Sequence, residues 1–150
     1  MTGKRLLDED SDDSGEVNTV RTSQPARLSV STGTHWEALA GYARAVRTGP
    51  LICVSGTTST ADDGSVVGAD AAEQTLFALA KIERALAQLG ATLRDVVRTR
   101  IYVRHIDDWE AAARAHGKVF GDIRPANTLV AAELVGAEYL VEVEADAWVS

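Results

Sequence analysis

Residues 95–104 of the sequence, DVVRTRIYVR, decide the fold because two kinds of side chain alternate along them. The apolar or small positions are Val97, Thr99, Ile101 and Val103, and the polar positions are Arg98, Arg100, Tyr102 and Arg104. Successive side chains of a β-strand point to opposite faces of its sheet. We therefore predict a strand with one buried face and one face that carries arginines.

A second alternating stretch, LVEVEADAWV at residues 140–149, ends the chain. Its apolar positions are Val141, Val143, Ala145, Ala147 and Val149, and the positions between them are Glu142, Glu144, Asp146 and Trp148. A stripe of carboxylates and a stripe of arginines on one sheet are stable only if they are solvated or paired with each other. An oligomer that brings such faces together would also pair them.

Two helices are predicted between and beside these strands. Asp70 and Glu73 form a capping-box-like start, apolar residues then recur at steps of three and four, and Gly90 is a suitable stop. Asp107 and Glu110 give a second cap signal. The apolar stripe of this second helix is Trp109, Ala112, His116, Val119 and Phe120, and it ends at Gly121.

The remaining segments predict further strands. Residues 42–46 and 51–55 flank a Gly49-Pro50 turn and are typical of a β-hairpin, and residues 127–134 read as a strand before the last one. The order is then β-β-α-β-α-β-β. Amphipathic helices can cover one face of a sheet, so we expect an α+β domain with a single sheet and two helices on one face.

Composition and length limit the class of protein. The chain has 150 residues, and we expect a disordered acidic tail over 1–25 and one domain over 26–150. A partner-binding acidic arm is the less favoured interpretation of the tail. A net charge of −7 argues against binding to nucleic acid or to an anionic membrane. A single cysteine, with no apolar stretch long enough for a signal peptide or a membrane span, favours the cytoplasm.

The order of elements and several local strings resemble the Rid (YjgF) family, whose members also carry endoribonuclease L-PSP and translation-inhibitor labels. The strings that match are Gly41-Tyr42, Val54-Ser55-Gly56, Gln74-Thr75, Asp95-Val96-Val97, Asp108-Trp109, Pro125-Ala126-Asn127 and Val141-Glu142-Val143-Glu144-Ala145. The resemblance implies a chorismate-mutase-like fold and a homotrimer with ligand clefts between subunits. It also implies hydrolysis of imines and enamines such as 2-aminoacrylate, without a metal or an organic cofactor.

One position departs from the family pattern. Asn127 stands where deaminating members have an arginine that grips the substrate carboxylate. A guanidinium grips a carboxylate with two parallel charge-assisted hydrogen bonds, and a neutral amide cannot do the same. We therefore expect reduced or altered activity on 2-aminoacrylate-type substrates. Arg100 could supply the missing cation, although pairing with the carboxylates of the last strand is the favoured interpretation.

The resemblance assigns roles to further residues. Glu142 matches the carboxylate that positions the hydrolytic water; a strand glutamate paired with Arg98 or Arg100 is the equal alternative. Ser55, beside Gly56, would polarise the substrate. The alternative is that Ser55 only forms the hydrogen bonds of an ordinary turn at the end of a strand. The substrate-binding candidates are Tyr42, Gly56, Arg100, Trp109, His116, Asn127, Thr128 and Leu129.

Other reactive side chains have plainer interpretations. A satisfied core histidine is favoured for His116 over a general base, and Cys53 is expected to be a buried, inert thiol. The histidines and the cysteine show no metal-ligand spacing. The leading function is hydrolysis of a small imine, an enamine or a related C–N bond at an intersubunit cleft. A non-catalytic trimer that binds a small polar metabolite is the alternative, and a role on RNA ranks lowest.

Overall fold

The computed structural model describes residues 25–150, so the predicted tail lies, except for Pro25, outside the described residues. The elements are β1 (Arg27–Val30), α1 (His35–Ala40), β2 (Ala45–Thr48), β3 (Leu51–Thr58), α2 (Ala71–Gln88), β4 (Val96–Val103), α3 (Trp109–Phe120), β5 (Ala126–Ala131) and β6 (Val141–Trp148). From β2 onward the predicted order is confirmed. The pair β1 and α1 was missed because β1 buries only Val30 and α1 is a helix of 6 residues, so neither shows a periodic apolar pattern.

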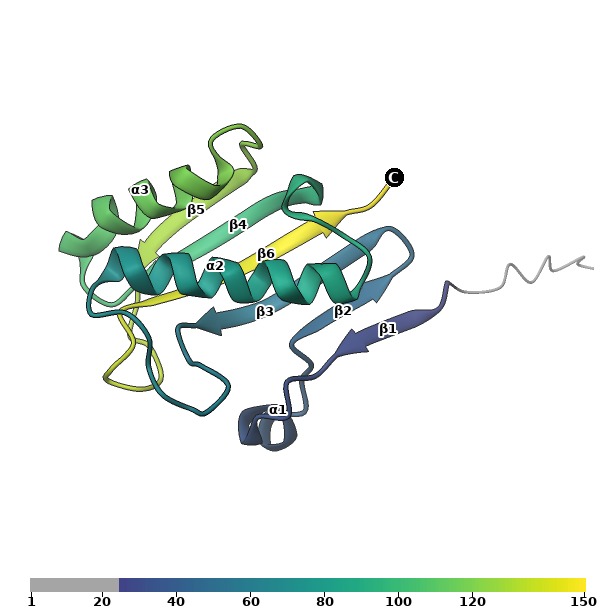
Figure 1. Ribbon diagram of the computed structural model, residues 1–150, viewed down its shortest axis with the longest axis horizontal. Helices are drawn as coiled ribbons and strands as arrows, with labels where there is room; N and C mark the ends of the chain where they lie inside the picture. The colour runs from purple at the N-terminus through teal and green to yellow at the C-terminus, as the bar shows by residue number, and fades with distance from the viewer. Residues whose placement is uncertain (1–24) are drawn as a thin grey trace, which may run out of the picture.

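The strands form one sheet in the order β1-β2-β3-β6-β4-β5. Only β4 and β5 are parallel, and all other neighbours are antiparallel. Helices α2 and α3 lie side by side across one face (Figure 1), and the core lies between them and the sheet. The predicted α+β fold with two helices on one face is confirmed.

The alternation of β4 is interrupted at its start. Val96 is buried, whereas Val97 is 51% exposed, so the sequence interpretation of Val97 as a core position is wrong. The pairing of β4 with β6 shifts register between Val96 and Arg98. A bulge sets two residues opposite one and restarts the alternation, and Thr99, Ile101 and Val103 are buried as predicted.

Helix α2 begins as predicted and also holds a distant loop. The Asp70 carboxylate accepts from the Glu73 amide at 2.9 Å, and the Glu73 carboxylate accepts from the amide of Ala69. Gln74, which is buried, donates to the carbonyl of Glu138 at 3.2 Å and accepts from the amide of Leu140 at 2.8 Å. The first turn of α2 therefore fixes the loop that leads into β6.

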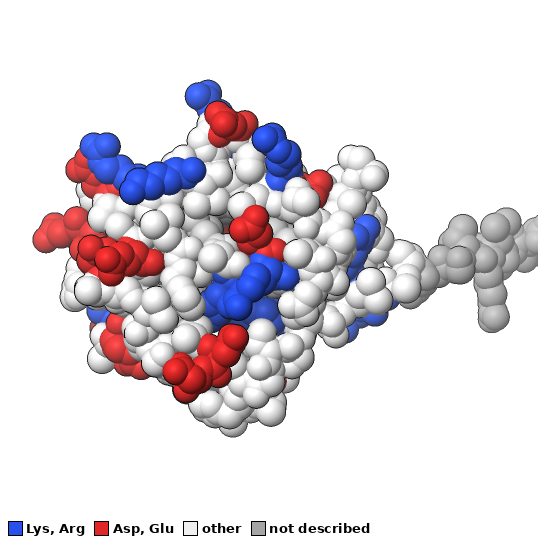
Figure 2. Space-filling view, in the orientation of Figure 1, with Lys and Arg blue, Asp and Glu red and all other residues white. Residues whose placement is uncertain are grey.

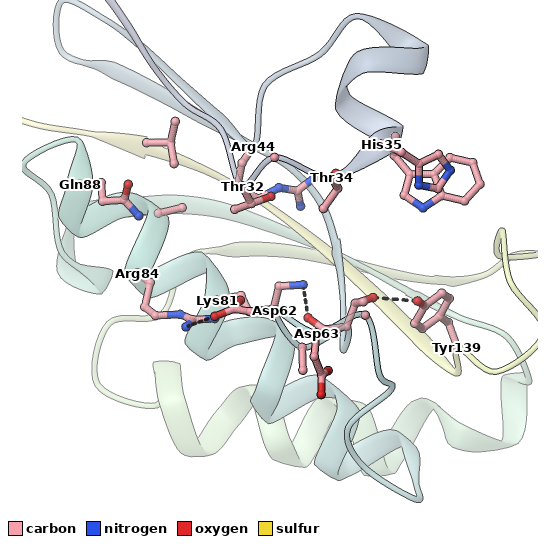
Figure 3. A pocket seen from close by; sticks show the side chains of 17 residues that line it. Thr32, Thr34, His35, Arg44, Asp62, Asp63, Lys81, Arg84, Gln88 and Tyr139 are labelled. Atoms are coloured by element: carbon pink, nitrogen blue, oxygen red, sulfur yellow. Dashed lines mark hydrogen bonds and ion pairs between the residues drawn. The ribbon is translucent and has the colours of Figure 1, made fainter.

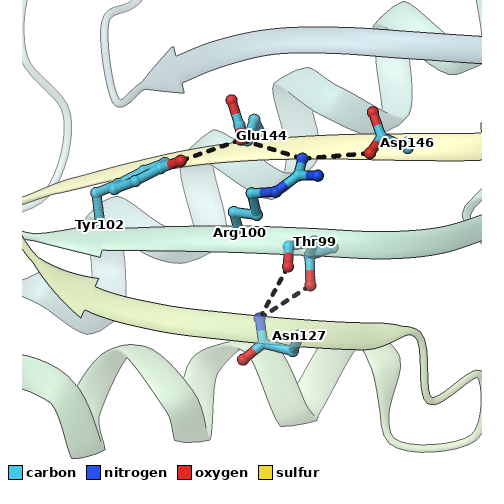
Figure 4. A network of polar contacts seen from close by, with 6 residues as sticks. All are labelled: Thr99, Arg100, Tyr102, Asn127, Glu144 and Asp146. Atoms are coloured by element: carbon cyan, nitrogen blue, oxygen red, sulfur yellow. Dashed lines mark hydrogen bonds and ion pairs between the residues drawn. The ribbon is translucent and has the colours of Figure 1, made fainter.

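The sheet face without helices carries the charged network that Figure 4 shows. Arg100 Nη1 lies 3.1 Å from Glu144 Oε1 and 3.2 Å from Asp146 Oδ2, and the Tyr102 hydroxyl donates to Glu144 at 3.1 Å. The favoured pairing of Arg100 with the last strand is confirmed, and it forms within one chain. Arg100 is therefore not a free cation for a substrate.

Cys53 lies on this same open face and is exposed, so the expectation of a buried thiol is wrong. The stretch Leu51–Val54 is apolar throughout and gives no sign of which residues face inward; the structure buries Ile52 and Val54. Desolvation and the neighbouring Asp146 carboxylate raise the pKa of the Cys53 thiol. Because the thiolate is the reactive form, the raised pKa agrees with an unreactive cysteine.

Candidate functional site

A cavity with two adjoining lobes lies where the end of β3, the segment around α1 and the middle of α2 approach one another. The smaller lobe has a volume of about 350 Å³ and the larger about 700 Å³. Figure 3 shows the larger lobe with its side chains. The residues that line both lobes are Thr32, Thr34, Trp36, Arg44, Thr60, Lys81 and Tyr139. Tyr42, Gly56, Thr58 and Glu142 line the smaller lobe alone.

Glu142 enters the smaller lobe because residue 56 is a glycine. A Cβ built on Gly56 would lie 2.0 Å from Oε1 of Glu142 and 3.0 Å from its carboxyl carbon. Any other residue at this position would need the space that the carboxylate occupies. The two strands that carry these residues are neighbours, since Thr58 of β3 pairs with Glu142 of β6.

The Glu142 carboxyl lies in an environment suited to a proton-transfer group. Burial raises its pKa, the charge of Arg44 lowers it, and the neighbouring Glu144 raises it, with a net upward shift. None of the ion pairs among residues 25–150 includes Glu142, so the alternative of a pair with Arg98 or Arg100 is wrong. A half-buried carboxyl with a raised pKa keeps its proton to a higher pH than an exposed glutamate does, which suits a group that transfers protons.

Arg44 lines the smaller lobe together with Glu142. Its Nη1 donates to the carbonyl of Gly56 at 2.7 Å and to Thr57 Oγ1 at 2.8 Å, and its Nη2 donates to the Tyr42 hydroxyl at 3.3 Å. The guanidinium also lies 5.6 Å from the centre of the Tyr42 ring. Since the Tyr42 oxygen accepts from Arg44, its own proton remains available for a ligand.

Lys81 reaches into the cavity from α2. Its ammonium donates to the carbonyls of Thr58 at 3.0 Å and Thr60 at 2.7 Å. Burial lowers the pKa of Lys81 to about 8, with Arg44 contributing in the same direction. The Thr60 hydroxyl donates to that of Tyr139 at 2.8 Å, a contact visible in Figure 3.

The segment before β2 is held in place by a buried glutamate. Glu37 accepts from the hydroxyls of Ser31 and Thr32 and from the amide of Thr32. Burial, the largest effect, raises the pKa of Glu37, but the hydrogen bonds from Ser31 and Thr32 outweigh it and lower the pKa. This arrangement fixes the Thr32–Trp36 segment that closes one side of both lobes.

The predicted site residues separate into groups within one chain. Tyr42, Gly56 and Glu142 are brought together in the smaller lobe. Ser55 precedes Gly56 in the sequence, but the Ser55 hydroxyl donates to the carbonyl of Ala43 at 2.8 Å. The proton that was expected to polarise a substrate is therefore already used inside the chain.

Asn127 and His116 form a separate polar cluster on the helix side of β4 and β5. Asn127 Nδ2 donates to Thr99 Oγ1 at 3.0 Å (Figure 4), and Thr99 Oγ1 lies 2.9 Å from His116 Nε2. The Thr99 hydroxyl can then donate to His116 only if that nitrogen is unprotonated. Burial also lowers the pKa of His116. The geometry supports the satisfied core histidine.

The other predicted binding residues lie outside both lobes. Thr128 pairs with Arg100 across β4 and β5, and Leu129 packs against the core. Trp109 is exposed at the start of α3. Contact between any of these and the cavity would require a second chain.

Sequence reasoning missed Arg44, Lys81 and Tyr139. Lys81 lies in an amphipathic helix, where a lysine ordinarily indicates a solvated face. Arg44 lies one residue before β2 and Tyr139 lies in a loop, so neither belongs to a periodic pattern. The one available signal was the position of Arg44, two residues after a tyrosine that was itself a candidate.

Residues 25–150 contain neither a metal-binding cluster nor a helix that could span a membrane. No cluster of three or more His, Cys, Asp or Glu residues in 25–150 could hold a metal ion. Within the same residues, none of the helices combines the length and apolar character needed to cross a bilayer.

Known proteins resemble this chain over most of its length. The model of a family described as Endoribonuclease L-PSP matches residues 32–149. An uncharacterized protein of Streptomyces coelicolor is 36% identical over 85% of this chain and 95% of its own length. A 3-aminoacrylate deaminase, RutC, of Acinetobacter baylyi is 32% identical over 70% of this chain and 84% of its own length.

Solved structures share the fold. A crystal structure of a Mycobacterium tuberculosis member of the YjgF/YER057c/UK114 family superimposes with a TM-score of 0.76 at 49% identity. The match covers 83% of this chain and 100% of that one. A Thermotoga maritima structure superimposes with a TM-score of 0.69 at 28% identity over 73% of this chain and 87% of that one.

Proposed function

This chain belongs to the endoribonuclease L-PSP (YjgF, Rid) family, and on that basis we propose that it hydrolyses a small imine or enamine to a carbonyl compound and ammonia. The cavity that contains Glu142, Tyr42 and Arg44 is the proposed site of this reaction.

The observation that carries the proposal is the placement of Glu142. Its carboxyl lies against Gly56 in a cavity of about 350 Å³ and has a raised pKa. Among the described residues it belongs to no ion pair, so no structural role accounts for it. A half-buried carboxylate that forms no ion pair costs stability, which is a common feature of functional sites.

The proposed reaction consumes one water and releases one ammonia. An enamine first takes a proton from water at carbon and becomes an iminium ion, and an imine reacts as the same protonated form. Glu142 accepts a proton from a water as that water attacks the iminium carbon, and the carboxyl then passes the proton to the nitrogen of the resulting carbinolamine. The C–N bond breaks, ammonia leaves, and the hydroxyl gives its proton to the Glu142 carboxylate to form the carbonyl; release of that proton to solvent restores the carboxylate. Tyr42, whose hydroxyl proton is free, would donate a hydrogen bond to the nitrogen or to the forming carbonyl oxygen.

The 3-aminoacrylate deaminase relative supports this class of substrate. The enzyme of that name removes an amino group from an unsaturated acid. Asn127 in this chain donates to Thr99 instead of offering a cation, which supports a carboxylate position that differs from the arginine clamp expected of deaminating members.

A homotrimer is part of the proposal. The open sheet face carries exposed apolar side chains around the Arg100 network, namely Leu51, Val130 and Trp148. Large exposed apolar side chains on one face of a sheet are common at interaction sites of soluble proteins. Light scattering should give three times the chain mass of 16.0 kDa, and a monomer at micromolar concentration would contradict the trimer.

The experiment for the reaction measures ammonia and keto acid released from an imine generated in the assay. The imine carries a carboxylate. The rate of release with the protein is compared with the rate of spontaneous hydrolysis in buffer. Release above the spontaneous rate supports an enzyme. Tight binding of the keto acid without any acceleration would instead support the alternative, a trimer that binds a small metabolite.

A further inference from the structure

Two cations, Arg44 and Lys81, line the cavity, and neither forms an ion pair among residues 25–150. The Arg44 side chain is nearly buried, with 7% of the residue exposed, and every hydrogen bond it donates goes to a neutral oxygen. Lys81 likewise donates only to two backbone carbonyls. The ion pairs within residues 25–150 involve other cations, namely Arg84, Arg100 and Arg114.

Cations bonded only to carbonyls can be purely structural, and this chain contains such a case. Arg104 donates to the carbonyls of Tyr139, Leu134 and Gly136 and lines neither lobe. Arg44 and Lys81 differ from Arg104 because both line the two lobes at their junction. Each also has donors without a hydrogen bond among the described residues: one ammonium proton on Lys81, and the Nε proton and one Nη2 proton on Arg44.

Two like charges that share a cavity destabilise each other. Burial, the largest effect, and the charge of Arg44 lower the pKa of Lys81, against a smaller opposing effect of Asp62. Asp62 and Asp63 line the larger lobe and Glu142 lines the smaller, but none of them forms an ion pair with Arg44 or Lys81 among residues 25–150. A bound carboxylate would reduce the repulsion between the two cations and would accept hydrogen bonds in which both partners are charged. The junction of the lobes can therefore receive a negatively charged group.

We infer that Arg44 and Lys81 form the subsite that binds the carboxylate of the substrate. The inference rests on the proposed function only for the identity of the anion. Glu142 lines the smaller lobe and Lys81 lines both, so an acid bound across the smaller lobe places its carboxylate at the cations and its reacting carbon toward Glu142. Asn127 is neutral and supplies no positive charge for the carboxylate. The subsite supplies that charge from within one chain.

The test measures binding, without turnover, of pyruvate and its neutral amide, pyruvamide, by isothermal titration calorimetry. The wild type should bind pyruvate more tightly than pyruvamide. Lys81→Met and Lys81→Gln should each weaken pyruvate about 10-fold or more, since a charged hydrogen bond is lost. Pyruvamide affinity should not change. Lys118→Met, which removes an exposed lysine on α3, is the matched control and should bind pyruvate as the wild type does.

The pH dependence separates a binding cation from a structural one. Pyruvate affinity of the wild type should fall as the pH rises above about 8, where free Lys81 loses its proton. Lys81→Arg should retain affinity within a few-fold and lose this pH dependence, because a guanidinium stays protonated.

Equal affinity of the wild type for pyruvate and pyruvamide, or no pyruvate binding, would overturn the subsite. Unchanged pyruvate affinity in folded Lys81→Met and Lys81→Gln would do the same. Failure of the proposed reaction is distinguishable: pyruvate would bind with the predicted dependence on Lys81 while imines would be hydrolysed no faster than in buffer.

Discussion

Gly56 and Glu142 share one space: a Cβ on residue 56 would lie 2.0 Å from the Glu142 carboxylate oxygen. The glycine has no positive φ to explain it, so its role is to leave room for the carboxylate. This relationship links the Val54-Ser55-Gly56 string to the Val141–Ala145 string, which sequence reasoning could place in one family pattern but not in contact.

Replacing Gly56 with alanine should therefore impair the reaction more than the fold. The clashing atom is the end of a flexible side chain, so Glu142 can move aside at a cost of about 1 kcal/mol or less. We expect kcat/KM to fall about 10-fold to 100-fold, because the carboxylate is displaced. Gly117→Ala is the matched control, since a Cβ there meets nothing within 4 Å. A folded Gly56→Ala with full activity would show that the position of Glu142 is unimportant.

Glu142→Gln should raise stability at neutral pH. The folded state raises the pKa of this carboxyl above 4.5, so the folded protein binds the proton more tightly than the unfolded chain. Stability in the wild type then falls as the pH rises from 4.5 through the folded pKa. Removing the charge should therefore raise the melting temperature above that range and leave it unchanged below it. Thermal melts of both proteins across this range test the sign; a less stable glutamine variant at neutral pH would contradict it.

Asn127→Arg should not restore a missing clamp if the carboxylate lies at Arg44 and Lys81. Asn127 is bonded to Thr99 within the chain, so the substitution should cost about 1 kcal/mol of stability. We expect kcat/KM for carboxylate-bearing imines to change less than about 3-fold. A gain in kcat/KM of about 10-fold to 100-fold is what one bidentate pair would supply. Such a gain would instead place the carboxylate near residue 127.

RNA cleavage should be absent, although the family description contains the word endoribonuclease. The chain carries a net charge of −7, and in Figure 2 the basic side chains on the helix face are interspersed with acidic ones. An acidic chain binds RNA weakly because the phosphates repel it. Incubation with labelled RNA tests this. Cleavage that co-purifies with the protein and disappears in Glu142→Ala would contradict the prediction.

Much of the fold could be predicted because it follows from local periodicity. The alternation of residues 98–103 and 141–148 set the faces of β4 and β6, and the Asp70 cap set the start of α2. The bulge at Val97 and the exposure of Cys53 could not be predicted, since both depend on how neighbouring strands pair.

The site was only partly predictable for a different reason. Family strings pointed to Tyr42, Gly56 and Glu142, which the structure brings together. Arg44, Lys81 and Tyr139 join them from three separate elements, and no spacing in the sequence connects a lysine on a helix with a hairpin arginine. Arg44 and Lys81 stand out because they are buried or half-buried and form no ion pair among the described residues. Both properties appear only in the folded chain.

The most direct measurement compares ammonia release by the wild type, Glu142→Gln and Glu144→Gln. Both glutamates lie on β6, two residues apart, but Glu144 is paired with Arg100 and lines neither lobe. If Glu142 transfers protons in the cavity, Glu142→Gln should lose about 100-fold or more in kcat, and Glu144→Gln should stay within a few-fold of the wild type. Equal activity of the wild type and a folded Glu142→Gln would contradict a catalytic role for this carboxylate.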